Sequence, residues 1–351
     1  MSAADALPEP DRAGDAPHPR ETERLFGQEA AEAAFLEAWN GGRMHHGWLL
    51  TGPRGVGKAT LAWRIARFLL CDPPAQTDSL DPPPDHPALP RIRALSEPGL
   101  MLLRRAWDEK KKRLQAQITV EEARKLGGFF AMSSGGRRVV IVDAADELNP
   151  NAANAILKLL EEPPAQATLL LVSHQPARLL PTIRSRCRVL RLAPLPHDAL
   201  VAAIAQAGGD PAGAELAEGS VGAALALAEG GAEIYAELTA LFARAPMDRA
   251  RARKLAESCA GRAGTDRLQM VLDAVDRLLY RAARAGLLGP GDGAEAEVLA
   301  RLSPHDAAAR DWARLAQEIG DRAGHARAVN VDPVAIVWDA LARIDAQARK
   351  T

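Results

Sequence analysis

One stretch of the sequence limits the possible folds more than any other, a glycine-rich turn between an apolar run and a helical pattern. The turn is Gly52-Pro53-Arg54-Gly55-Val56-Gly57-Lys58-Ala59-Thr60, and it follows Trp48-Leu49-Leu50. Glycines let backbone N–H groups converge on oxygens, and the N-terminus of the helix that follows favours anions. The order of strand, turn, lysine and helix predicts a phosphate cradle in an α/β fold, with Lys58 as its point charge.

The turn departs from the usual pattern at one position. G-x-x-x-x-G-K is normally followed by Ser or Thr, whose hydroxyl holds Mg²⁺, and this chain has Ala59 there. Thr60 comes one residue late and lies on another face of the helix. The sequence therefore predicts nucleotide binding by residues 52–60 and weakens the case for metal-assisted hydrolysis. The alternative is a glycine-rich turn that binds nothing.

A second motif joins an apolar strand to an acid. Val139-Val140-Ile141-Val142 is a run of β-forming residues typical of a buried parallel strand, and Asp143 follows it. Ligands of open α/β sheets lie at the carboxyl ends of the strands. We expect Asp143 to hold, through water, the metal ion on a phosphate bound by Lys58. An aspartate that only caps the next turn is the simpler alternative.

The pattern changes along the chain. Residues 1–22 are rich in Pro and charge and poor in large apolar residues, which predicts a disordered arm. Up to residue 193, strands near 99–103, 139–143, 168–173 and 189–192 alternate with helices, which indicates a doubly wound parallel sheet. From residue 194 the chain is Ala-rich and helical, with a Pro/Gly linker at 286–293, and predicts a packing and assembly region.

Composition excludes several classes of protein. A net charge of −1, from 44 basic and 45 acidic residues, argues against attraction of the whole molecule to DNA or to an anionic membrane. The charged stretch 108–113 is expected to be a solvated loop, with a nucleic-acid contact as the alternative. Three widely spaced cysteines and the lack of a long apolar stretch predict a soluble cytoplasmic protein without disulfides.

These motifs together resemble one family, the clamp-loader branch of the AAA+ ATPases, and within it the delta-prime family of bacterial DNA polymerase III subunits. The resemblance covers about residues 25–230. It depends on residues 46–52 leading into the turn, on residues 139–143, on the Leu-Glu-Glu-Pro-Pro end of the helix at 154–164, and above all on Ser185-Arg186-Cys187.

The resemblance implies an architecture and partners. It implies an α/β AAA+ domain at 23–193, a helical lid at 194–235 and a helical collar at 236–351 that joins a ring of subunits. The ring, with its gamma/tau ATPase and delta subunits, places the sliding clamp on primer-template DNA for the DNA polymerase holoenzyme, a nucleotidyltransferase. By resemblance, Arg186 is an arginine finger that reaches the ATP of a neighbouring subunit. The alternative is an Arg186 that pairs with an acid of its own domain.

Departures from the family pattern imply a subunit that does not turn over ATP. Ala144 stands where hydrolysing relatives have the glutamate that polarises water, and Gly222 stands where they have the lid arginine. The polar sensor position falls on Ser173 or His174. Cys71 alone remains of the zinc-binding cysteines of many relatives, so we expect no metal site. ATP or ADP is expected to bind weakly, if it binds, and without hydrolysis.

Two other classes of function stay open at this point. One is an active ATPase, either the motor subunit of the same ring or another AAA+ remodelling enzyme, and both Ala59 and Ala144 argue against it. The other is a P-loop kinase or unrelated nucleotide-dependent enzyme, for which Ser185-Arg186-Cys187 would be a coincidence.

Overall fold

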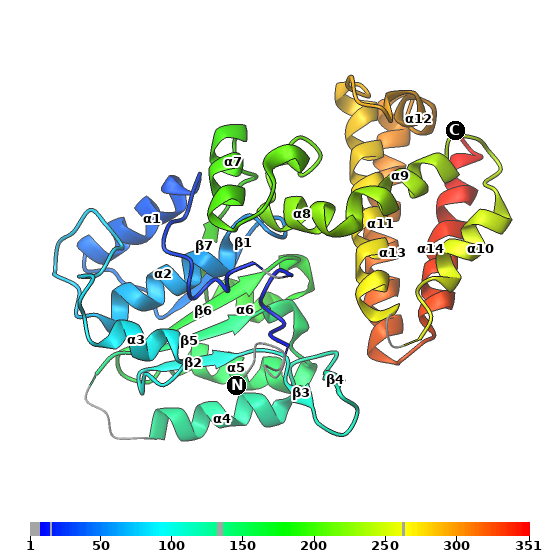
Figure 1. Ribbon diagram of the computed structural model, residues 1–351. Coiled ribbons are helices and arrows are strands. Elements are labelled where there is room, and N and C mark those ends of the chain that lie inside the picture. The colour runs from blue at the N-terminus through cyan, green and yellow to red at the C-terminus, as the bar shows by residue number, and fades with distance from the viewer. Residues whose placement is uncertain (1–7, 15, 132–135, 262–263) are drawn as a thin grey trace. The chain divides into compact units, whose positions relative to one another are not determined.

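The structure is a computed structural model, and it describes residues 8–14, 16–131, 136–261 and 264–351 (Figure 1). The chain forms two compact units, Met1–Leu225 and Ala226–Thr351. The boundary between the units falls inside the stretch that the resemblance assigned to a helical lid. The finer division at residues 22, 193 and 235 stays a prediction.

A five-stranded sheet with the strand order β2-β5-β6-β1-β7 is the centre of the first unit. All neighbouring strands in it are parallel. The strands are β1 (Gly47–Thr51), β2 (Leu100–Leu103), β5 (Arg138–Asp143), β6 (Ala167–Ser173) and β7 (Arg188–Arg191). The predicted parallel α/β P-loop fold is therefore confirmed, with every expected strand present.

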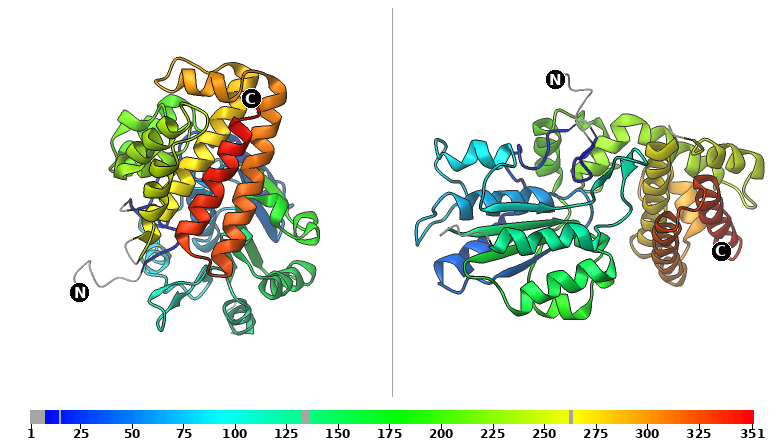
Figure 2. Two further views of the ribbon diagram at one scale, coloured as in Figure 1. Left: turned by 90° about the vertical axis from the view of Figure 1, so that its right-hand side faces the viewer. Right: turned by 90° about the horizontal axis from the view of Figure 1, so that it is seen from below.

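Helices cover both faces of the sheet, and this explains why its central strands are continuous apolar runs. Every residue of β5 and β6 is buried. Val140 and Val142 pack in one cluster with Leu126 of α4 (Val120–Ala131) and Ile156 of α5 (Pro150–Glu161), while α2 (Lys58–Leu70) lies on the other face (Figure 1 and, at right, Figure 2). The remaining helices of this unit are α1 (Glu29–Asn40), α3 (Ala88–Arg93), α6 (Pro181–Ser185), α7 (His197–Gln206) and α8 (Val221–Ala226), which ends one residue into the second unit.

The charged stretch 108–113 forms the turn of a small hairpin. Its strands are β3 (Trp107–Asp108) and β4 (Arg113–Leu114), and they are antiparallel. The side chains of Lys111 and Lys112 lie near the carboxylates of Asp108 and Glu109 in the same turn. These charges thus have local partners and are solvated, as a surface loop requires.

The second unit is helical. It contains α9 (Ala232–Leu241), α10 (Arg249–Glu257), α11 (Gly264–Leu288), α12 (Ala296–Leu302), α13 (Asp306–Ala328) and α14 (Pro333–Ala348). Its core includes Trp312, which is fully buried and donates its indole N–H to the carbonyl of Leu302 at 2.6 Å. Although α11 has 25 residues, no helix in the described ranges is sufficiently long and apolar to cross a membrane.

One part of this unit differs from the prediction. The linker expected at 286–293 lies at 289–295, because α11 continues to Leu288 and α12 begins at Ala296. Gly286 lies inside α11, and a Cβ there would lie 2.4 Å from Ser303 Oγ and 2.7 Å from the carbonyl oxygen of His305. The glycine at this position lets the end of α11 pack closely against the turn before α13, rather than ending the helix.

The expectation of a disordered arm at 1–22 also differs from the structure where the chain is described. His18 and the Asp11 side chain are almost completely buried, and His18 Nε2 lies 3.0 Å from Asp11 Oδ2. Arg104, just after β2, pairs with both Asp11 and Glu9. The imidazole of His18 meets the Trp63 ring of α2 edge-on, with centroids 5.8 Å apart. Composition could not predict this packing, because it does not tell which distant residues pair with Asp11 and His18.

The next residues of the same segment are held by the backbone. Arg67 of α2 donates to the carbonyl oxygens of Arg20 at 3.0 Å and Thr22 at 2.9 Å. A guanidinium has five fixed N–H donors, so one side chain can bind two carbonyls of a passing segment at once. Residues 8–14 and 16–22 are therefore part of the first unit, while residues 1–7 and 15 lie outside the described residues.

Replacement of Arg104 tests this packing. We expect Arg104→Ala to lower the free energy of unfolding by about 1–3 kcal/mol, because it leaves the buried Asp11 carboxylate without its cation. Limited proteolysis should then cleave residues 8–22 faster than in the parent chain. Arg314→Ala, at an exposed arginine of α13, is the matched control. Unchanged cleavage and stability in Arg104→Ala would contradict the packing.

Candidate functional site

The glycine-rich turn lies between β1 and α2, as predicted, and the space around it explains why glycine is required there. Gly52 has a φ of +142°, and a Cβ there would lie 2.3 Å from the carbonyl oxygen of Leu192. No side chain fits at such a distance. Lys58, Ala59 and Thr60 form the first turn of α2, Val56 is buried, and Pro53 and Arg54 are exposed.

Lys58 is buried, and the turn itself binds its ammonium. Lys58 Nζ donates to the carbonyl oxygens of Gly52 at 2.8 Å and Pro53 at 2.5 Å. Burial lowers the pKa of Lys58 to about 8, although the nearby carboxylates of Asp143 and Asp146 oppose this shift. The ammonium of Lys58 therefore lies in the turn, where it was predicted, but it is bound to two backbone carbonyls. Phosphate oxygens would have to displace these carbonyls.

The start of α8 closes on the turn. Ser220 Oγ donates to the carbonyl oxygen of Arg54 at 2.9 Å, and the N–H of Val221 donates to that of Gly55 at 3.0 Å. A Cβ on Gly55 would lie 2.3 Å from Ser220 Oγ, and a Cβ on Gly222 would lie 3.2 Å from Gly55 Cα. Gly222, where the resemblance led us to expect an arginine in hydrolysing relatives, therefore permits a backbone contact that a larger residue would push apart.

Asp143 ends β5 beside this turn, as predicted. Burial is the main cause that raises the pKa of Asp143 to about 8; the charges of Asp11 and Glu147 add to it, and Lys58 and Arg54 oppose it. The carboxyl group is thus largely protonated at neutral pH. The methyl of Ala59 cannot ligate Mg²⁺, which prefers ionised carboxylates and hydroxyls. The donor set at this site therefore lacks the hydroxyl that a magnesium ion requires here.

Asp146 is a site residue that the sequence reasoning missed. It lies in the short 3₁₀ turn Ala145–Glu147, and its Oδ1 accepts the hydroxyl of Ser173 at 2.5 Å. Its Oδ2 accepts the backbone N–H groups of His174 at 2.6 Å and Gln175 at 3.2 Å. Both oxygens are therefore engaged in joining the chain after β5 to the end of β6. Asp146 is consequently no substitute for the glutamate that is replaced by Ala144.

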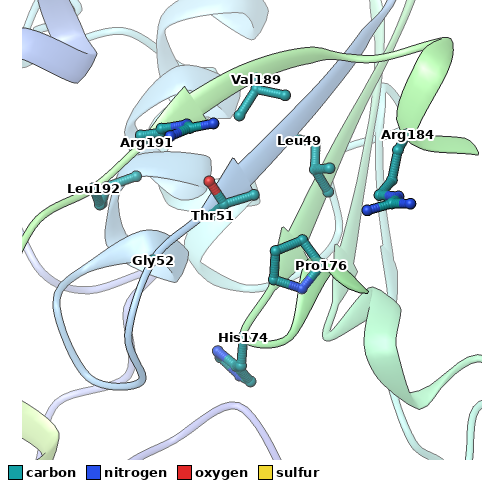
Figure 3. Close-up of a pocket in the computed structure, with 9 residues that line it drawn as sticks. All are labelled: Leu49, Thr51, Gly52, His174, Pro176, Arg184, Val189, Arg191 and Leu192. Atoms are coloured by element: carbon teal, nitrogen blue, oxygen red, sulfur yellow. The ribbon is translucent and has the colours of Figure 1, made fainter. Parts of the chain in front are cut away.

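The structure separates the two candidates for the sensor position. Ser173 is fully buried, and Asp146 engages its hydroxyl. His174 lines a hollow beside the turn (Figure 3). Burial and the positive charges of Lys58 and Arg54 lower the pKa of His174 to about 3, so its ring is neutral. Its Nδ1 is buried without a hydrogen-bond partner in the part of the chain that the structure describes. His174 is therefore the residue of the pair that faces the turn.

Arg186 lies apart from this cluster. It follows α6 and precedes β7, and β7 runs parallel to β1, so Arg186 is at the amino edge of the sheet while the turn is at the carboxyl edge. Its guanidinium lies 3.1 Å from Glu161 Oε1 and donates to the carbonyl of Thr182 at 3.1 Å. The pairing within its own domain, which the sequence left as an alternative, is thus present. Both partners are about 40% exposed, so the ion pair contributes only about 0–1 kcal/mol.

Other metal chemistry has no centre in the described ranges. Within residues 8–14, 16–131, 136–261 and 264–351, no group of three or more His, Cys, Asp or Glu side chains could hold an ion. Cys71, Cys187 and Cys259 are free thiols, and burial raises the pKa of Cys71 to about 11. A thiol with so high a pKa is a weak ligand and nucleophile near neutral pH.

Asp143→Asn tests the electrostatics of the site. The pKa of Asp143 is about 8 in the folded chain and 3.8 in the unfolded reference, so the folded state binds more protons between these values. Its contribution to stability therefore falls as pH rises from about 4 to 8. We expect Asp143→Asn to flatten this slope and to be at least about 1 kcal/mol more stable at pH 7.5. Denaturant unfolding at several pH values measures both effects.

The matched control is Asp85→Asn, at an exposed aspartate. Its unfolding should follow the pH dependence of the parent chain. A slope in Asp143→Asn as steep as that of the parent would show that Asp143 titrates normally.

Known proteins resemble the region that carries these residues. Residues 27–196 match the protein family described as DNA polymerase III, delta subunit. The DNA polymerase III subunit delta′ of Pseudomonas aeruginosa is 43% identical over 160 residues, which are 44% of this chain and 46% of the relative. The subunit delta′ of Escherichia coli is 35% identical over 211 residues, 56% of this chain and 58% of the relative. That of Bacillus subtilis is 33% identical over 158 residues, 45% of each chain.

The chain spans about half the length of the curated relatives it matches. The matched part contains the turn, Asp143, Asp146, His174 and Arg186. The resemblance inferred from the sequence motifs is thereby confirmed over residues 27–196, which match the family described as DNA polymerase III, delta subunit.

Proposed function

We propose that the chain is the delta-prime subunit of a bacterial clamp loader, which helps to place the sliding clamp on primed DNA. The observation that carries this proposal is the family match over the α/β region, in which the phosphate-binding turn is kept and the groups for hydrolysis are not. Its partners would be the gamma/tau ATPase and delta subunits of the ring. Through the assembled ring it would meet the clamp and primer-template DNA, in the cytoplasm.

In this role the chain does not hydrolyse ATP. Ala59 supplies no hydroxyl for magnesium, and Ala144 supplies no carboxylate to polarise water. A further carboxylate, that of Asp146, accepts three hydrogen bonds from Ser173, His174 and Gln175. Ala59, Ala144 and Asp146 thus leave no free group to activate water, and the alternative of a motor subunit is disfavoured.

The turn is nonetheless suited to weak binding of ATP or ADP. The backbone of residues 52–60 could accept phosphates if Lys58 exchanged the carbonyls of Gly52 and Pro53 for phosphate oxygens. The contact of Ser220 and Val221 with the turn would have to open or to accommodate the nucleotide. Asp143, largely protonated at neutral pH, would add little repulsion to a phosphate. The free energy needed to displace the carbonyls from Lys58 and to open the contact of Ser220 and Val221 explains why we propose a low affinity.

We further propose that Arg186 acts on a neighbouring subunit. Arg186 lies at the amino edge of the sheet, whereas the glycine-rich turn of its own domain lies at the carboxyl edge. One exposed ion pair with Glu161 holds its side chain. Such a pair is easily exchanged for a stronger partner. A guanidinium presents a planar fork of donors to phosphate oxygens and stabilises charge that develops in the transition state of phosphoryl transfer.

The first test is the ATPase rate of the isolated chain. We expect it to equal the background, because loss of each missing group typically costs a factor of roughly a hundred or more. The double substitution Ala59→Thr with Ala144→Glu restores both groups and should raise the rate if nucleotide reaches the turn. Lys58→Ala is the control. Turnover by the parent chain that Lys58→Ala abolished would contradict the proposal.

The second test is Arg186→Ala in an assembled ring. An arginine finger supplied in trans is worth about 10³–10⁵ in rate in other phosphoryl-transfer systems, and any part of this should be measurable in the DNA-stimulated ATPase. We expect the rate to fall while the ring still assembles. Glu161→Ala, which removes the present partner of Arg186, should leave the rate intact. A normal rate with Arg186→Ala would refute the finger.

A further inference from the structure

A hollow of about 500 Å³ lies over β1 and β7 in the first unit (Figure 3). Leu49 and Val189 are direct partners in the register of these two strands, and Thr51 is the partner of Arg191. Because side chains alternate along a strand, these four residues share one face of the sheet. Leu49 and Val189 thus form an aliphatic floor, and Pro176 lines the hollow beside them.

The floor is open at one side. β7 is the last strand in the sheet order, and the Val189 side chain in its middle is 43% exposed, although its neighbour Leu49 is buried. The helix that precedes β7, α6, has five residues and is too short to cover the strand. An apolar partner that covered Val189 would gain the free energy of burying an aliphatic surface.

Two arginines flank this floor. Arg184 comes from α6 and Arg191 from the end of β7, and Figure 3 shows Leu49, Thr51 and Val189 between them. Both side chains are exposed. Among the described residues neither guanidinium has an ion pair or a hydrogen-bond partner, and no acidic side chain lines the hollow. The site therefore combines an apolar centre with positive charge on both sides.

We propose that this groove, formed by Leu49, Pro176, Val189, Arg184 and Arg191, binds an extended acidic segment of a partner protein. An aliphatic side chain of the segment lies on Val189, and a carboxylate on each side pairs with Arg184 and with Arg191. The fork of a guanidinium matches the two oxygens of a carboxylate, and such charge-assisted bonds are the stronger ones in proteins. The proposal does not depend on nucleotide binding or on ring assembly.

A nucleic acid fits the same groove less well. Grooves for single strands place aromatic side chains where bases can stack, and they track the backbone with many basic groups. Here no Phe, Tyr or Trp lines the hollow, and the only aromatic ring is that of His174 next to the turn. An aliphatic floor with two separated arginines is the chemistry of a peptide with alternating apolar and acidic residues.

The experiment uses the full chain and a short fluorescent peptide in which Asp and Glu flank a central Leu. Fluorescence anisotropy measures the binding of this peptide to the chain. We expect saturable binding, and each of Arg184→Glu and Arg191→Glu should weaken it by about tenfold, since one charge-assisted contact is lost and a repulsion is added. The matched control is the double substitution Arg253→Glu with Arg314→Glu, at exposed arginines of the helical unit, which should bind as the parent does.

Two further arms test the apolar centre and the class of partner. A peptide with Ser in place of the central Leu should bind the parent chain at least about tenfold more weakly than the Leu peptide does. The Leu peptide should bind Val189→Asp more weakly than the parent chain by the same factor. Circular dichroism checks that each variant is folded. The proposal is overturned if the parent chain shows no saturable binding, if the arginine variants bind normally, or if the Ser peptide binds equally well. It is also overturned if oligothymidylate displaces the peptide at lower concentration, because the groove would then bind nucleic acid.

Discussion

The parallel pairing of β5, β6 and β1 is the constraint on which the site depends. Thr51 pairs with Ser173 and Asp143 pairs with Val172, so these strands end at one edge of the sheet. Parallel strands need crossovers, and each crossover here passes through helices that bury the sheet. The glycine-rich turn, Asp143 and His174 therefore meet although they are far apart in the chain.

Burial at that edge changes the chemistry of the side chains that meet there. In a poorly solvated place the neutral forms are favoured, so the pKa of Lys58 falls to about 8 and that of Asp143 rises to about 8. The ammonium of Lys58 then depends on the carbonyls of its own turn, and Asp146 joins the ends of β5 and β6. These contacts stabilise a closed arrangement of the turn, and they would have to rearrange to admit a nucleotide.

Residues 8–14 and 16–22 show the limit of prediction from composition. Their low content of apolar residues predicted disorder, but the buried contact of Asp11 with His18, the ion pair of Asp11 with Arg104 and the carbonyls bound by Arg67 hold these residues. Asp146 is a second such residue. Nothing in its local sequence distinguishes it from other loop aspartates, because its partner lies at the end of β6. A charged side chain contributes to packing only through its partner, and the partner is distant in sequence.

The sequence by itself determined the order of strands and helices up to residue 193, the glycine-rich turn and the position of Asp143, because periodicity, glycine spacing and helix capping act between near neighbours. It also placed alanine at positions 59 and 144, where the resemblance leads us to expect groups for hydrolysis. Only the tertiary structure decided that His174 rather than Ser173 faces the turn, that Arg186 pairs with Glu161, and that Arg184 and Arg191 flank an open floor. These depend on which strands become neighbours, and that is settled by the burial of the whole sheet.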